Sequence, residues 1–227
     1  MSKDIIIVGG SKGGVGKSMV CAGVIDTLRA HGEAPVLIDS DTDNPDVYKM
    51  YKDEVRTETI DLDLAEGWID FVNLCDTHGD CPVVVNTAAR NNRGVSAHAQ
   101  TLHHALAELH RRVVTFWVIN RQRDSLELLG DYLEAMQGSV LHVVRNGHFG
   151  ELHKFELYNN SNLRKRIEEA GGTSLLYPDL ADRVSDDLYS KRLSIDAALR
   201  VLPLGNRAEL TRWRAAVREV LGGALYA

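Results

Sequence analysis

The sequence has few of the residues that stabilise small extracellular domains, and it lacks long apolar segments. Three cysteines occur among 227 residues, with no Cys-x-x-Cys spacing, so neither a disulfide framework nor a zinc or iron–sulfur site is indicated. No apolar run approaches the ~18 residues of a membrane span, and no cationic start precedes a long apolar stretch. We therefore expect a protein of the cytoplasm.

An excess of positive charge is also missing. The formal charge is −6 at pH 7, which argues against coating nucleic acid through bulk charge. Four basic clusters are typical of solvated helix ends, and local binding of nucleic-acid phosphates is the alternative interpretation. The clusters are Arg111-Arg112, Arg121 with Arg123, Arg164-Lys165-Arg166 and Lys191-Arg192. With 44% hydrophobic residues the chain can bury a full core, and we expect residues 1–227 to form one domain.

Short apolar runs alternate with helical stretches along the chain. The runs are rich in Val and Ile without alternation, which predicts strands buried on both faces, at residues 5–8, 35–38, 82–85, 113–119, 139–144 and 173–177. The expected helices cover residues 17–31, 64–77, 96–111, 125–136, 162–170, 182–200 and 207–221. This order predicts a doubly wound, mostly parallel α/β sheet with helices on both faces. In such sheets ligands bind at the carboxyl ends of the strands.

The last expected helix has two interpretations. Asn206 can cap it, with Glu209 at capping-box spacing. An apolar stripe flanked by arginines is formed by Leu210, Trp213, Val217 and Leu221. The stripe favours packing on the sheet with the arginines reaching solvent. A basic amphipathic helix that binds a membrane surface is the less favoured alternative.

A glycine-rich loop follows the first apolar run. Residues 12–18 read Lys-Gly-Gly-Val-Gly-Lys-Ser. Such a turn between a strand and a helix points backbone N–H groups into one concavity, which suits a polyphosphate. Lys17 would then reach the β/γ-phosphates and the Ser18 hydroxyl would hold Mg²⁺. The alternative is an ordinary glycine-rich turn. The predicted nucleoside triphosphate contacts are Gly13, Gly14, Val15, Gly16, Lys17, Ser18 and Met19.

The loop departs from the common phosphate-binding pattern at its start. Ser11 stands where that pattern has glycine, and a second lysine, Lys12, opens the loop. With Lys-Gly-Gly-x-Gly-Lys-Ser the chain resembles the deviant Walker A ATPases of the ParA/MinD superfamily. The resemblance implies an ATP-dependent homodimer in which Lys12 reaches the nucleotide of the other subunit. The alternative for Lys12 is a solvated loop charge.

An acidic segment follows the second apolar run. It reads Asp39-Ser40-Asp41-Thr42-Asp43-Asn44-Pro45-Asp46, and four carboxylates so close together need a cation or a helix N-terminus to compensate them. By resemblance this is switch I. Asp41 would orient the attacking water beside a metal ion. Asp39 would support the metal site without contacting the ion directly. The implied metal-site residues are Ser18, Asp39 and Asp41. A polar loop that caps a helix is the alternative.

The third apolar run ends in Asn86-Thr87-Ala88-Ala89-Arg90. The family normally has an aspartate where this chain has Asn86. An amide can hydrogen-bond a water on Mg²⁺ but brings no negative charge. We therefore expect slow hydrolysis, and no hydrolysis at all is the alternative. Residues 91–94 are expected to form a mobile loop that senses the γ-phosphate. Arg90 or Arg93 would contact phosphate, contact a partner or face solvent.

The sequence favours an adenine nucleotide. No Asn-Lys-x-Asp, the guanine-reading pattern, is present. By resemblance Asn146 would read the adenine, and Pro178 would lie in the loop beside the base. Asn-Gly is also an ordinary turn signal, and proline commonly ends strands.

The resemblance implies a slow ATPase switch of the plasmid partition or conjugation type. Lys12, Lys17 and Asp41 would carry catalysis with ATP/ADP and Mg²⁺ as cofactors. The implied partners are a second copy of the chain, a small adaptor protein and, as a further option, non-specific DNA, with no membrane. Two alternatives stay open: a nucleotide-binding scaffold without turnover, and a metabolic relative of the dethiobiotin synthetase group. The paired cysteines of the nitrogenase iron protein are lacking.

Overall fold

Seven strands form one parallel sheet in the part of the chain that the computed structural model describes, which is residues 3–10, 12–89 and 92–226. The strand order is β3-β2-β4-β1-β5-β6-β7, and every neighbouring pair is parallel. The strands are β1 (Ile5–Gly10), β2 (Val36–Asp39), β3 (Arg56–Thr59), β4 (Val83–Asn86), β5 (Val113–Ile119), β6 (Val140–Asn146) and β7 (Ser174–Tyr177).

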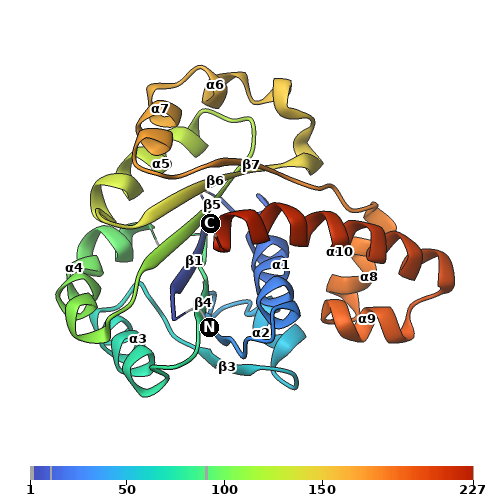
Figure 1. Ribbon diagram of the computed structural model, residues 1–227, viewed down its shortest axis with the longest axis horizontal. Coiled ribbons are helices and arrows are strands. Elements are labelled where there is room, and N and C mark those ends of the chain that lie inside the picture. Colours follow the sequence, from blue (N-terminus) through green and yellow to red (C-terminus); the bar gives the residue numbers. More distant parts are fainter. Residues whose placement is uncertain (1–2, 11, 90–91, 227) are drawn as a thin grey trace.

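Helices cover both faces of this sheet (Figure 1). One face packs against α1 (Lys17–Ala30), α2 (Asp46–Tyr51), α8 (Asp182–Ser190), α9 (Ile195–Val201) and α10 (Leu204–Leu225). The other packs against α3 (Ala65–Thr77), α4 (Asn92–Leu109), α5 (Asp124–Ala135), α6 (Glu156–Asn159) and α7 (Asn162–Glu169). Two short 3₁₀ turns, η1 (Gly147–Phe149) and η2 (Leu152–Lys154), follow β6. The predicted doubly wound α/β class is confirmed.

The central strand β1 contributes to both cores. Ile6 and Val8 lie in the core under α1, whereas Ile5 and Ile7 lie in the core under α3 to α5. Because successive side chains of a strand point to opposite faces, an unbroken apolar run is what this position requires. Helix α1 leaves β1 on one face, and α4 leaves the neighbouring β4 on the other. The carboxyl ends of these two strands therefore border a crevice.

The structure corrects three expectations about local structure. Strand β3 was not predicted, because its sequence Arg-Thr-Glu-Thr is polar and largely exposed at the sheet edge. The single helix expected over residues 182–200 is two helices, since Arg192 has a φ of 52° and the Ser194 side chain accepts a hydrogen bond from Ala197 N. Helix α10 begins at Leu204, so Asn206 lies in its first turn and donates to Asp187 instead of capping.

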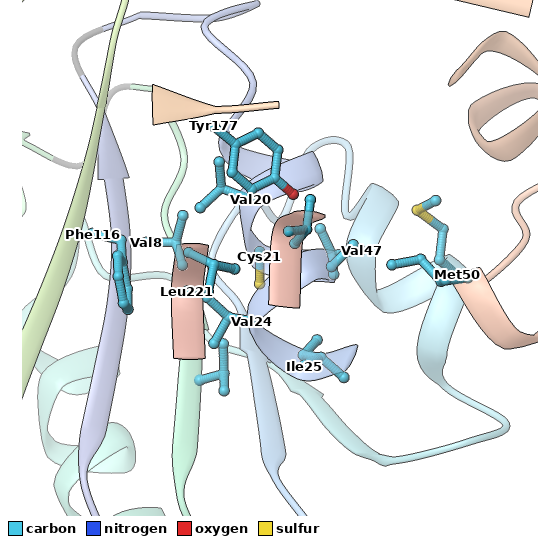
Figure 2. Packing of buried hydrophobic residues seen from close by; sticks show 14 of the residues in the cluster. Val8, Val20, Cys21, Val24, Ile25, Val47, Met50, Phe116, Tyr177 and Leu221 are labelled. Carbon is cyan, nitrogen blue, oxygen red and sulfur yellow. The ribbon is translucent and has the colours of Figure 1, made fainter. Parts of the chain in front are cut away.

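Helix α10 packs its apolar stripe on α1 and β7, as the favoured interpretation predicted, but Arg214 and Arg218 turn to the buried Asp26 instead of reaching solvent. All four stripe residues are buried. Gly23 of α1 permits the close approach, because a Cβ there would lie 2.5 Å from the Tyr177 hydroxyl and 2.8 Å from a Val217 methyl. Figure 2 shows Leu221 over Val24 and beside Cys21 in this core. Within the described residues, no helix combines the length and apolarity that crossing a membrane requires.

A buried carboxylate fastens α10 to α1. Asp26 of α1 is 3% exposed, and its Oδ2 accepts from Arg214 Nε at 3.0 Å and from Arg218 Nε at 2.7 Å. Arg214 also pairs with Asp196 of α9. Because the arginines are themselves partly buried, their charges depend on this carboxylate for compensation.

Replacing Asp26 with asparagine should destabilise the fold by about 2–3 kcal/mol, since Arg218 loses its counter-charge and Arg214 keeps only Asp196, while the remaining exposure screens part of the loss. Urea denaturation measures the change. Asp80→Asn is the matched control, because Asp80 is 93% exposed in its pair with Lys3, and the denaturation midpoint of this variant should stay at the wild-type value. Equal midpoints for the two variants would contradict the role given to Asp26.

Candidate functional site

A cavity of about 500 Å³ opens at the carboxyl ends of the strands. Segments that follow β1, β2, β4, β6 and β7 meet there. Nine of the predicted site residues line it: Gly13, Gly14, Gly16, Lys17, Ser18, Met19, Asp41, Asn146 and Pro178. Three others lie outside its lining: Val15 is buried in the core, Asp39 is fully buried at the end of β2, and Lys12 contacts α5. Sequence reasoning did not assign Ser185, Tyr189 or Trp213 to the site, although all three line the cavity.

The loop between β1 and α1 needs its glycines. Gly14 and Gly16 have φ values of 76° and 102°, in the left-handed region that side chains disfavour. A Cβ on Gly16 would also lie 2.3 Å from the Asn146 amide nitrogen. That nitrogen donates to Val15 O at 2.9 Å, and Asn146 Oδ1 accepts from His148 N. Asn146 therefore supports the loop backbone, a role that sequence reasoning missed.

Lys17 carries a charge that is largely removed from water. It is 8% exposed, and its Nζ donates to the backbone oxygen of Lys12 at 2.8 Å. Burial lowers the pKa of Lys17 to about 8, and the nearby Asp41 carboxylate opposes part of this shift. One carbonyl and one carboxylate compensate the ammonium only in part. An anion entering the cavity would strengthen the protonated form.

Lys12 forms an ion pair with Asp124, the first residue of α5. Both side chains are about half exposed, at 44% and 56%. The hydrogen bond from Lys12 lowers the pKa of the Asp124 carboxyl. Sequence reasoning missed Asp124, although its place just after β5 puts it at the same sheet edge as the loop.

Asp39 and Asn86 face each other across β2 and β4. Asp39 Oδ1 accepts from Asn86 Nδ2 at 2.9 Å and from Asp41 N at 3.3 Å, and its Oδ2 accepts from Tyr48 N of α2 at 3.0 Å. Burial raises the pKa of Asp39, and these hydrogen bonds oppose the rise. Both oxygens of Asp39 are thus engaged by the protein. Asp41 is less buried and lines the cavity, with its Oδ1 near Asn44 N at 3.4 Å.

The segment expected to be a mobile loop at residues 91–94 is instead the start of a helix from residue 92 onward. Helix α4 begins at Asn92, and Gly94 packs so closely that a Cβ would lie 1.9 Å from Leu62 O. Arg93 is exposed and lines a separate hollow with Asp63. Arg90, the other arginine proposed for phosphate contact, lies outside the described residues, as does Ser11.

Most of the basic clusters contact the protein itself. Arg111 is buried and donates to the backbone oxygens of Lys3, Cys75 and Cys81. Ion pairs hold four further members of these clusters: Arg112 with Asp4, Arg164 with Glu168, Arg166 with Glu134, and Lys191 with Asp187. The expectation of solvated side chains holds for these four paired members, which are 38–62% exposed, and is wrong for Arg111, which is buried.

The side chains at the cavity could bind a cation only together with the phosphate groups of a bound nucleotide. In the described part of the chain no three His, Cys, Asp or Glu side chains gather as metal ligands. Ser18 and Asp41 line the cavity, and the buried Asn86 Oδ1 has no hydrogen-bond partner among the described residues. Mg²⁺ typically uses one or two carboxylates, several waters and substrate phosphates. The residues present would supply the protein's part of such a set.

Comparison with known proteins agrees with this geometry. Residues 6–157 match the family described as the CobQ/CobB/MinD/ParA nucleotide binding domain. Protein MobD of Acidithiobacillus ferrooxidans is 61% identical over 226 residues, which is 100% of both chains.

Two solved structures share the fold. The MinD cell division protein of Aquifex aeolicus has a TM-score of 0.57 at 14% identity, covering 96% of this chain and 97% of the other. A nucleotide-binding protein of Archaeoglobus fulgidus in complex with ADP has a TM-score of 0.50 at 15% identity, covering 84% and 88%. Since the family match includes the phosphate loop, the segments after β2 and β4, and the strand that ends in Asn146, the chain belongs to the CobQ/CobB/MinD/ParA family of nucleotide-binding domains.

Proposed function

We propose that the chain is an ATP-dependent switch that dimerises around ATP and Mg²⁺, hydrolyses the nucleotide slowly and so positions protein or DNA cargo. The observation that carries this proposal is the loop between β1 and α1. Two glycines in the left-handed region shape its backbone beside Lys17, whose largely buried ammonium donates to one backbone oxygen. A polyphosphate would supply the missing negative charge and the acceptors for the loop N–H groups.

The position of Lys12 supports the dimer part of the proposal. Its partner Asp124 is a single, half-exposed carboxylate, so the pair contributes little energy and can exchange at small cost. A triphosphate on a second subunit offers more negative charge and more acceptors than Asp124 does. Lys12 would therefore leave Asp124 for that triphosphate when two subunits meet at this edge.

The hydrolysis part of the proposal depends on Asp41. It lines the cavity close enough to Lys17 to affect the pKa of that lysine, which supports a role in orienting a water near the terminal phosphate. Asn86 specifically favours a second candidate function, a nucleotide-binding scaffold without turnover, because this neutral amide adds no charge for a metal ion. The proposed adaptor protein and DNA rest on the family resemblance.

Nucleotide binding should take up a proton on Lys17. Its pKa of about 8 rises when phosphate contacts it, so affinity should fall as pH increases above about 8. Calorimetry with ATP at pH ~8.5, in two buffers of different ionisation enthalpy, should show uptake of about 0.7 proton. Lys17→Arg should abolish the uptake, and Lys17→Ala should weaken binding by about 10- to 100-fold. The exposed control Lys52→Ala should bind as wild type, and normal binding by Lys17→Ala would refute the site.

ATP should convert wild-type monomers to dimers in sedimentation velocity runs, whereas ADP and buffer should not. Lys12→Ala should stay monomeric with ATP because the cross-subunit phosphate contact is lost. Asp124→Asn should dimerise at equal or lower ATP, since Lys12 is released from its carboxylate. Glu127→Gln, on the same helix, serves as the control and should match wild type. A dimer that ignores ATP, or one that persists without Lys12, would overturn the switch.

Phosphate release decides between the switch and the scaffold. Asp41→Ala should slow release by at least about 10-fold if Asp41 orients the attacking water. Asp43→Ala, a change of the same kind two residues along the same segment, should leave the rate unchanged. Equal rates for wild type and Asp41→Ala would favour the scaffold.

A further inference from the structure

Three hydrogen bonds join the segment after β2 to the segment after β4. Asn86 Nδ2 donates to Asp39 Oδ1 at 2.9 Å, Ser40 N donates to Asn86 O at 2.9 Å, and Ala88 N donates to Ser40 Oγ at 3.1 Å. Asp39 is 0% exposed and Asn86 is 3% exposed, so this link is shielded from water. Through its Oδ2, Asp39 also holds Tyr48 N in α2. The link therefore fixes the acidic segment at both of its ends.

The side-chain part of this link pairs one carboxyl group, that of Asp39, with a neutral amide. The amide must present its Nδ2 to Asp39, because its oxygen would meet the carboxylate acceptor to acceptor. A carboxylate at position 86 would instead face Asp39 at the same short separation. Two carboxylates that close cannot both stay ionised without a proton or a cation between them. Asn86 donates a hydrogen bond directly to Asp39, so this contact needs neither a shared proton nor a cation.

The other end of the amide adds little attraction for a cation. Asn86 Oδ1 is buried, and no hydrogen-bond donor contacts it among the described residues. The residue lines the cavity, so this oxygen is an acceptor for a donor that arrives with a ligand, such as a water on the phosphates. A neutral oxygen of this kind attracts Mg²⁺ less strongly than a carboxylate does.

We infer that Asn86 is a positioning residue that locks the two segments together without a metal ion, so that nucleotide affinity in this protein depends only weakly on Mg²⁺. The affinity part of this inference rests on the proposed nucleotide binding. The lock itself is a property of the free protein. Asp39 stays oriented by Asn86 whether or not a cation accompanies the nucleotide.

The first test is ATP affinity measured by calorimetry with Mg²⁺ and with EDTA. Wild type should change by less than about 10-fold between the two conditions, whereas Asn86→Asp should lose about 100-fold or more in EDTA, because its two carboxylates then repel each other. The double variant Asp39→Asn/Asn86→Asp exchanges the amide and the carboxylate, restores one charge, and should regain the weak dependence. A wild-type dependence as large as that of Asn86→Asp would overturn the inference.

The second test needs no nucleotide. Thermal unfolding of wild type should give the same midpoint with Mg²⁺ and with EDTA. Asn86→Asp should unfold at a lower temperature in EDTA and recover in part with Mg²⁺, whereas Asn86→Ala should be destabilised equally in both. If Asn86→Asp does not fold, the double variant Asp39→Asn/Asn86→Asp takes its place. Its unfolding midpoint must then be the same with Mg²⁺ and with EDTA. Absence of ATP binding by every variant would refute the proposed function, whereas a Mg²⁺-dependent wild-type midpoint would refute the lock.

Discussion

The site is organised around a lysine whose charge is buried on the backbone of its own loop. Lys17 begins α1, and its ammonium contacts the Lys12 carbonyl in place of solvent. Desolvation disfavours that charge, as the lowered pKa of Lys17 reflects. The ammonium stays there because the loop is held in place. Its glycine turn sets the backbone path, α1 is packed in the core, and Asn146 donates a hydrogen bond to Val15 O. An anion placed beside Lys17 would therefore stabilise its protonated form.

The support for this loop comes from distant parts of the chain. Helix α1 lies between the sheet and α10. Gly23 permits the close packing of the two helices, and the Asp26 carboxylate of α1 accepts hydrogen bonds from two arginines of α10. Figure 1 shows that α10, the last helix, lies beside α1, the first. The amino end of α1 shapes the loop and the middle of the helix is held by α10. Packing of the carboxyl-terminal helix therefore positions the candidate site.

Several carboxylates line the cavity with Lys17, namely Asp41, Asp46 and Asp179. Among the aspartates of the acidic segment, Asp39 is turned into the protein and Asp41 faces the cavity. Asn86 brings no charge beside Asp39, so the two neighbouring strand ends meet through an amide–carboxyl hydrogen bond. The same substitution of an amide for an acid limits how much the protein contributes to binding a metal ion.

The sequence by itself determined the fold class, six of the seven described strands and the phosphate loop, because local patterns encode them: unbroken Val/Ile runs and a glycine spacing that only a tight turn requires. It could not give the polar edge strand β3, whose residues look like a loop until β2 pairs with them. Nor could it give the Lys12–Asp124 pair, the Asn146–Val15 contact or the Asn86–Asp39 link. Tertiary structure alone decided these, since each joins residues from different strand ends that meet only when the sheet has formed.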